Sequence, residues 1–144
     1  MISLENYFQG KPHTPDDDIA ADDLLVRVNE LIAEAERSVE FTSTNDPDTG
    51  TQISGSKGGS GDGGFRLSTS TTGSARSSHK EARAVDVFDP LGHFDNWLDK
   101  FEHGNGDNTM LAQYGLYREH PDHTPTWTHL STRAPGSGKR TFHP

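Results

Sequence analysis

Apolar positions repeat at helical spacing in the first third of the chain, behind a clear helix start. Thr14 can cap a helix, Pro15 suits its first position, and the aspartates at 16–18 face the positive end of the helix dipole. The apolar positions that follow are Ile19, Leu25, Val28, Ile32, Ala35 and Val39. This pattern predicts a long amphipathic helix that reaches about Glu40 and serves as scaffold.

Short strand patterns and two shorter helices fill the second half of the chain. β-branched and aromatic residues predict strands or extended pieces at 63–67, 83–88, 116–119 and 126–131. Apolar spacing predicts helices at 91–101 and 108–114, each followed by glycine. The order helix, strand, strand, helices, strand, strand favours an α+β fold, with a small antiparallel sheet and flanking helices.

Between these halves, residues 41–78 are rich in Gly, Ser and Thr. A loop of this length in a small domain is usually functional or disordered. The stretch 50–73 has two interpretations: a flexible flap over a cleft, or an insertion of no consequence. We favour partial disorder at 55–64.

Composition narrows the chemistry that the chain can carry. With 144 residues and 29% hydrophobic positions, the core must be small, and a bound metal ion could add to its stability. The chain has eight histidines and no cysteine, so imidazole and carboxylate are the available metal ligands. A net charge of −9 argues against nucleic-acid binding. The chain has no apolar run of membrane-spanning length and no secretion-signal pattern at its start, so we expect synthesis as a soluble cytoplasmic product.

A carboxylate interrupts the strand pattern at 83–88. Alternation places Asp86 on one face of the strand and Val85 and Val87 on the other, which we take as the core face. An unpaired carboxylate facing the covered side of a sheet is costly, so a cation or hydrogen-bond donors should meet it.

Two histidines can supply that partner. The same alternation places His129 on one face of the strand at 126–131, and His79 lies seven residues before Asp86. Two nitrogens and one oxygen with an open fourth position match a catalytic zinc site, in which zinc lowers the pKa of a bound water to about 7. Singly, each residue is more often structural, Asp86 as an ion-pair partner and each histidine as an ordinary hydrogen-bonded residue.

Three short motifs carry a resemblance to a known family. Ser77-Ser78-His79, Ala82-Arg83-Ala84-Val85-Asp86 and Trp127-Thr128-His129 resemble the Ser-x-His, Gly-x-Ala-x-Asp and Trp-x-His signature of zinc D-alanyl-D-alanine carboxypeptidases and endopeptidases, which share the hedgehog fold. The likeness covers residues 63–144, extends weakly to the N-terminal helix, and is strongest to a small bacteriophage type. Ala82 stands where the family has glycine.

The resemblance implies a role for each matched residue. His79, Asp86 and His129 would bind Zn²⁺, and Arg66, in a segment like the family's Gly-Tyr/Phe-Arg, would meet a substrate carboxylate or the oxyanion. Ser77 would orient the site, and Trp127 would contact substrate. The chain would be one peptidase-like domain over 1–144: a helical segment at 1–40, the loop region at 41–78 and a metal-site core at 79–144.

The general base departs from the family pattern. Many members carry Asp or Glu three residues before the last histidine, where this chain has Thr126. Glu119 is our first choice for the base and Asp122 the second, although Glu119 could also be a solvated loop carboxylate. His120 and His123, in the same loop, could donate protons, bind a second ion, or simply be exposed.

These expectations lead to one main function and two alternatives. The main one is a zinc peptidase, a phage or prophage hydrolase that cuts peptide bonds next to D-alanine in peptidoglycan stem peptides. We expect a monomer that does not insert into membranes and that acts at the bacterial cell wall or is carried in the virion. The first alternative is a catalytically inactive, zinc-stabilised binding or virion structural module. The second is a chain that binds no metal.

Overall fold

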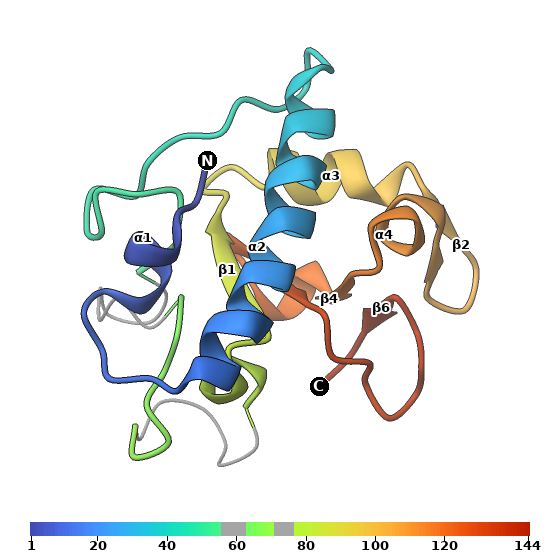
Figure 1. Ribbon diagram of the computed structural model, residues 1–144. Helices are drawn as coiled ribbons and strands as arrows, with labels where there is room; N and C mark the ends of the chain where they lie inside the picture. Colours follow the sequence, from blue (N-terminus) through green and yellow to red (C-terminus); the bar gives the residue numbers. More distant parts are fainter. Residues whose placement is uncertain (56–62, 71–76) are drawn as a thin grey trace.

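The computed structural model describes residues 1–55, 63–70 and 77–144, and Figure 1 shows its mixed α/β architecture. The helices are α1 (Leu4–Phe8), α2 (Pro15–Glu36), α3 (His93–Asp99), α4 (Thr109–Tyr114) and the 3-10 helices η2 (Ser78–Glu81) and η3 (Pro121–His123). The strands are β1 (Ala84–Phe88), β2 (Glu102–His103), β3 (Asp107–Asn108), β4 (Tyr117–Glu119), β5 (Trp127–Ser131) and β6 (Thr141–Phe142). None of the helices in these ranges is long and apolar enough to cross a bilayer.

Four strands form the main sheet in the order β1-β5-β4-β6. The pairs β1–β5 and β4–β5 are antiparallel, as predicted, but β6 runs parallel to β4. The sheet is therefore mixed, and the expectation of a purely antiparallel sheet is wrong at this edge. β6 contains two residues, too few to show an alternating pattern in the sequence, so its pairing was not predicted.

Helix α2 begins as the sequence predicts. The Thr14 hydroxyl accepts a hydrogen bond from the amide of Asp17, whose carboxylate accepts one from the amide of Thr14, which completes a capping box. The helix ends at Glu36 rather than near Glu40. Its buried face consists of Ala21, Leu24, Leu25, Val28, Leu31, Ile32 and Ala35.

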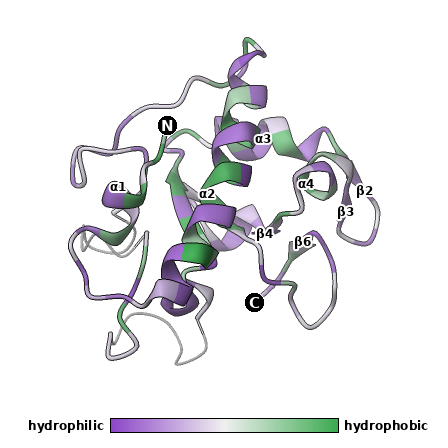
Figure 2. Ribbon diagram, in the orientation of Figure 1, coloured by the Kyte–Doolittle hydropathy of each residue, from purple (hydrophilic) through white to green (hydrophobic). Residues whose placement is uncertain are grey.

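Two residues assigned to the apolar stripe lie in solvent instead. Ile19 is 70% exposed and Val39, beyond the helix end, is fully exposed. The buried face passes through Leu24 and Leu31, so Ile19 points away from it. Figure 2 shows the resulting mixture of hydrophobic and hydrophilic residues around α2, and the apolar side joins Val85, Val87 and Leu130 of the sheet in one core.

Hydrogen bonds at the helix ends determine where the shorter helices begin and end. The carboxylate of Asp89 accepts hydrogen bonds from the amides of Phe94 and Asp95, so α3 starts at His93 and the predicted first residue, Leu91, is exposed. Helix α4 agrees with its prediction, because Asn108 caps its start and Gly115, in the left-handed conformation, ends it.

Irregular segments, rather than another strand, cover the outer edge of β1. The Gly63 carbonyl accepts a hydrogen bond from the Asp86 amide (2.7 Å), and the Ser54 amide donates to the Asp86 carbonyl (2.9 Å). The expected extended piece at 63–67 lies here without forming a strand. Residues 56–62 and 71–76, which include most of the stretch expected to be disordered and part of the expected flap, lie outside the described residues.

Helix α1 was not predicted, and it closes the core beside β1. Tyr7 and Phe8 are buried, and the Tyr7 hydroxyl donates to the Ala84 carbonyl at 2.8 Å. A five-residue helix is too short to show a periodic signal. Its contribution to the structure comes from these two aromatic side chains, which pack against Phe65.

Candidate metal centre

Strand register brings the first two candidate ligands together. Asp86 of β1 lies directly opposite His129 of β5, so their side chains project from the same face of the sheet. Val85 and Val87 point into the core on the other face, as the alternation predicts. The pairing of an interior aspartate with a histidine on adjacent strands is thus a consequence of period-two geometry.

The third candidate comes from the 3-10 helix η2, immediately before β1. The Ser77 hydroxyl caps η2 by accepting a hydrogen bond from the His79 amide at 3.3 Å. Ala82 ends the turn in the left-handed conformation, with φ of 56°. Glycine adopts that conformation without strain, so Ala82 is not the residue type that best suits this turn. The turn aims the buried His79 ring at Asp86.

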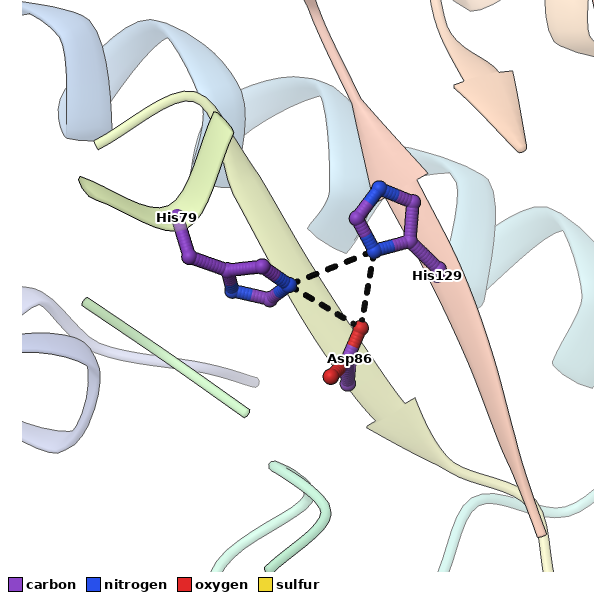
Figure 3. Close-up of side chains that lie close together, drawn as sticks. All are labelled: His79, Asp86 and His129. Atoms are coloured by element: carbon purple, nitrogen blue, oxygen red, sulfur yellow. Dashed lines mark hydrogen bonds and ion pairs between the residues drawn. The ribbon is translucent and has the colours of Figure 1, made fainter. Parts of the chain in front are cut away.

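The three side chains converge on one point (Figure 3). His129 Nδ1 lies 3.0 Å from Asp86 Oδ1, and His79 Nε2 lies 3.3 Å from that oxygen and 3.2 Å from His129 Nδ1. Tetrahedral zinc with ligands at about 2.0–2.1 Å would hold its ligand atoms about 3.3 Å apart. The described residues therefore include a buried group, His79, Asp86 and His129, that could hold a metal ion.

Hydrogen bonding determines which atom His79 offers. Its Nδ1 donates to the Gly64 carbonyl at 2.9 Å, which leaves the lone pair of Nε2 directed at Asp86 and His129. Burial lowers the pKa of His79 and so favours the neutral, ligating form. Burial alone would raise the pKa of Asp86, but the neighbouring histidines outweigh it and hold that pKa well below its ordinary range.

Electron-pair counting supports a cation at this point. With His79 Nε2 and Asp86 Oδ1 both acting as acceptors, only His129 can place a proton among the three converging atoms. Three acceptor atoms at 3.0–3.3 Å that share one proton are better matched by a dication, which all three can coordinate. The donor set thus fits a metal ion.

Arg66 lies beside the site, close to Oδ2 of Asp86, the carboxylate oxygen that does not face the histidines. Its guanidinium is 3.6 Å from Asp86 Oδ2, and its backbone amide donates to the His79 carbonyl at 3.2 Å. The side chain is buried, so its charge acts with little screening by solvent. Arg66 therefore supports Asp86 through Oδ2 while Oδ1 faces the histidines.

Glu119 is the last residue of β4, the strand next to β5. The β4–β5 register pairs Tyr117 with Ser131 and Arg118 with Leu130. Because side chains alternate along a strand, Glu119 lies on the same face of the sheet as Tyr117, and this face also carries His129. Glu119 is half-buried and is not part of the three-residue metal group.

Asp122 and Trp127 are the remaining sequence candidates. Asp122 has a side chain that is 80% exposed and interacts with His120, with Asp122 Oδ2 and His120 Nδ1 3.5 Å apart. Trp127 begins β5 opposite Phe88, on the same face as His129, and is half-buried. Asp122 and Trp127 are not members of the metal group.

Sequence reasoning missed the role of Gly63 and Gly64. A Cβ on Gly63 would lie 2.0 Å from the Ser54 carbonyl oxygen, and one on Gly64 would lie 2.5 Å from the Tyr7 carbonyl oxygen. Only glycine fits such close backbone approaches, and they aim the Gly64 carbonyl at His79. The consecutive glycines before Phe65 were the available signal.

Comparisons with known proteins add no further assignment. No protein-family model, curated protein or solved structure matches the chain. The candidate site therefore depends on its own geometry: three converging ligand atoms, an adjacent buried arginine and a glutamate in the next strand of the sheet.

Proposed function

We propose that His79, Asp86 and His129 bind Zn²⁺ and that the chain is a zinc peptidase with the hedgehog/DD-peptidase fold. Neutral imidazole and carboxylate suit zinc, and three protein ligands leave a fourth position for chemistry. The observation that carries the proposal is the convergence of Nε2, Oδ1 and Nδ1 within 3.3 Å of one another. The family motifs around these ligands support the same assignment.

The proposed reaction is hydrolysis of a peptide bond next to D-alanine in bacterial peptidoglycan. Bound zinc would supply an activated water and a Lewis acid for the scissile carbonyl. Glu119, on the adjacent strand and on the same face of the sheet as His129, would take the proton from the water and deliver it to the leaving amine. Arg66 would place a fixed positive charge near the substrate carboxylate or the developing oxyanion.

Each supporting residue has a distinct task in this proposal. Asp86 accepts from its surroundings through both oxygens, so it stays ionised and oriented while substrate binds. Gly64 fixes the tautomer of His79, and Ser77 fixes the turn that carries it. Trp127 would offer an apolar surface to the substrate stem peptide, at the end of β5 that precedes His129.

The decisive experiment combines metal analysis with digestion of purified muropeptides followed by mass spectrometry. We expect one equivalent of tightly bound zinc and loss of D-alanine, or opening of a cross-bridge. Glu119→Gln should retain zinc and lower the rate by about 10² to 10⁴-fold, the range for loss of a general base. Glu30→Gln, an exposed helix position, is the matched control and should keep full activity.

Two outcomes would contradict the proposal in different ways. Protein that binds no zinc at His79, Asp86 and His129 would remove its basis. Protein that binds one zinc but cleaves none of the muropeptides would exclude the peptidase.

The second candidate is an inactive, zinc-stabilised binding or virion module. The observation in its favour is that Thr126, which has no carboxylate, stands where many members of the resembled family carry Asp or Glu. This candidate predicts retention of muropeptides or whole cell walls by zinc-loaded protein without product formation. Equal behaviour of wild type and Glu119→Gln would favour it.

A further inference from the structure

A second group of histidines lies where β4 and β6 end. His123 Nε2 is 3.0 Å from His143 Nδ1, and the rings of His120 and His143 stack with centroids 4.5 Å apart at an interplanar angle of 17°. His123 and His143 are exposed, and His120 is half-buried. None of the three belongs to the group formed by His79, Asp86 and His129.

The parallel pairing of β6 creates this group from distant parts of the chain. Glu119 pairs with Phe142, and the His120 amide donates to the Phe142 carbonyl at 2.7 Å, which places His143 beside the β4–η3 connection. The His123 amide donates to the His120 carbonyl at 2.9 Å and turns the His123 ring back toward His143. Two ring nitrogens separated by 20 residues in sequence therefore face each other.

His120 has a supporting role in this arrangement. Its Nδ1 accepts a hydrogen bond from the Asp122 amide at 3.1 Å, so the Nδ1 lone pair is occupied and the neutral ring carries its proton on Nε2. A ring in that state has no lone pair for a metal. It instead stacks on His143 and restricts the orientation of that ring.

His123 and His143 have the opposite character. Their facing nitrogens can be joined by one shared proton, and a metal ion that replaces this proton would bind both lone pairs. The 3.0 Å separation is close to the distance of about 3.3 Å between two nitrogens of a tetrahedral zinc site. Small movements of two exposed rings would supply the difference.

We propose that His123 and His143 form a second metal site, specific for late transition-metal dications that prefer imidazole, such as Zn²⁺ and Ni²⁺. The protein supplies two ligands, and water or a small anion completes the coordination. Two ligands on an exposed surface bind more weakly than three buried ones, so this site fills after the buried centre. Because both ligating nitrogens must be deprotonated, its occupancy falls at acidic pH.

Calorimetric titration of the metal-free protein with Zn²⁺ tests this site. We expect two binding events for the wild type, the weaker with a dissociation constant at least tenfold higher. His123→Ala and His143→Ala should each abolish the weaker event and keep the tighter one. His103→Ala, which removes an exposed histidine in β2, is the matched control and should keep both.

A complementary variant separates this proposal from the buried centre. Asp86→Asn should lose the tighter event and keep the weaker one, and ring ¹⁵N signals of His123 and His143 should shift on Zn²⁺ addition. The weaker event in Asp86→Asn would support the second site even if the proposed peptidase function fails. A wild type whose only binding event is lost in Asp86→Asn, or a weaker event that persists in the His123→Ala/His143→Ala double variant, would overturn the inference.

Discussion

Two polar clusters lie on opposite faces of the same sheet. We call the group of His79, Asp86 and His129 the open cluster, because its acceptor atoms outnumber the protons between them. We call the group around Arg118 the closed cluster, because its acceptors meet a donor. On one face, His79, Asp86 and His129 present three converging acceptors with one proton to share. On the other face, Arg118 is 1% exposed and donates from each of its three nitrogens. The acceptors of the first cluster could therefore hold a metal ion, whereas those of the second already meet the guanidinium of Arg118.

The closed cluster joins parts of the fold that are remote in sequence. Arg118 of β4 donates to the Asp95 carboxylate at 3.0 Å, to Asp99 at 2.5 Å, to Glu102 at 3.1 Å and to the Thr141 hydroxyl at 3.0 Å. It thereby ties α3 and the residues of β2 to the sheet and links β4 to β6 within it. The comparison shows that a buried ionisable group alone does not indicate a metal site. It does so only when the neighbouring acceptor atoms have too few donors to pair with.

The largest expected effect tests the closed cluster. Arg118→Met should lower the free energy of unfolding by about 3 to 5 kcal/mol, because it leaves the buried carboxylate of Asp95 without its cation. Urea unfolding measures this loss. Arg37→Met, which removes an exposed arginine paired with Glu34, is the control and should cost less than about 1 kcal/mol. Equal losses of unfolding free energy in the two variants would show that the buried contacts of Arg118 do not stabilise the fold.

The next effect concerns the open cluster and depends on metal. Zinc at a thousandfold excess over its dissociation constant should stabilise the wild type by about 4 kcal/mol, and Asp86→Asn should remove this gain. Thermal unfolding with zinc and with a chelator gives both values. Asp48→Asn, which changes an exposed carboxylate, should preserve the gain. A zinc-induced stabilisation that survives in Asp86→Asn would contradict the ligand assignment.

A pH effect of about 4 kcal/mol is expected from the closed cluster. Burial raises the pKa of Asp95 to about 7 although Arg118 opposes the shift. The folded state then holds a proton between pH 4 and 7 that the unfolded state has released. The stabilising contribution is complete below about pH 4 and is lost as pH rises through 7.

Asp95→Asn checks the sign of this linkage. Urea unfolding of wild type and variant from pH 4 to pH 8 should show a wild-type advantage that shrinks as pH rises. Asp99→Asn has a half-exposed side chain in the same cluster and should change the pH profile less. An advantage that grows with pH would mean that the Asp95 pKa is lowered rather than raised.

The smallest expected effect is that of the cap that carries His79. Ser77→Ala should cost about 1 kcal/mol of unfolding free energy, since it removes the hydroxyl that accepts from the His79 amide. Ser77→Thr keeps a hydroxyl and should recover most of the loss. If both variants match the wild type in unfolding free energy and in zinc affinity, Ser77 does not position His79.

Sequence patterns predicted the parts of the site that depend on regular periods. Alternation in β1 and β5 correctly assigned the faces of Asp86 and His129, and the cap at Thr14 correctly placed the start of α2. The three proposed metal ligands do converge, as expected. Zinc and the roles of Glu119 and Arg66 in catalysis stay predictions.

The features that were missed depend on contacts without a local signal. β6 is two residues long, and His143 reaches His123 only through the parallel pairing of that strand. The carbonyl of Gly64 orients His79 through a close backbone approach that no periodicity encodes. The exposure of Ile19 follows from which side of α2 faces the sheet, a tertiary property that apolarity alone does not determine.

The covered flank of β1 also limits how the peptide substrate of the proposed function could bind. The Asp86 amide and carbonyl and the Phe88 amide already bond to Gly63, Ser54 and Gln52. An incoming peptide cannot add itself there as a fifth strand, since those main-chain groups are engaged. In the proposed peptidase, selectivity would therefore come from side chains and from the metal, so changing those side chains should alter ligand preference while the backbone framework stays intact.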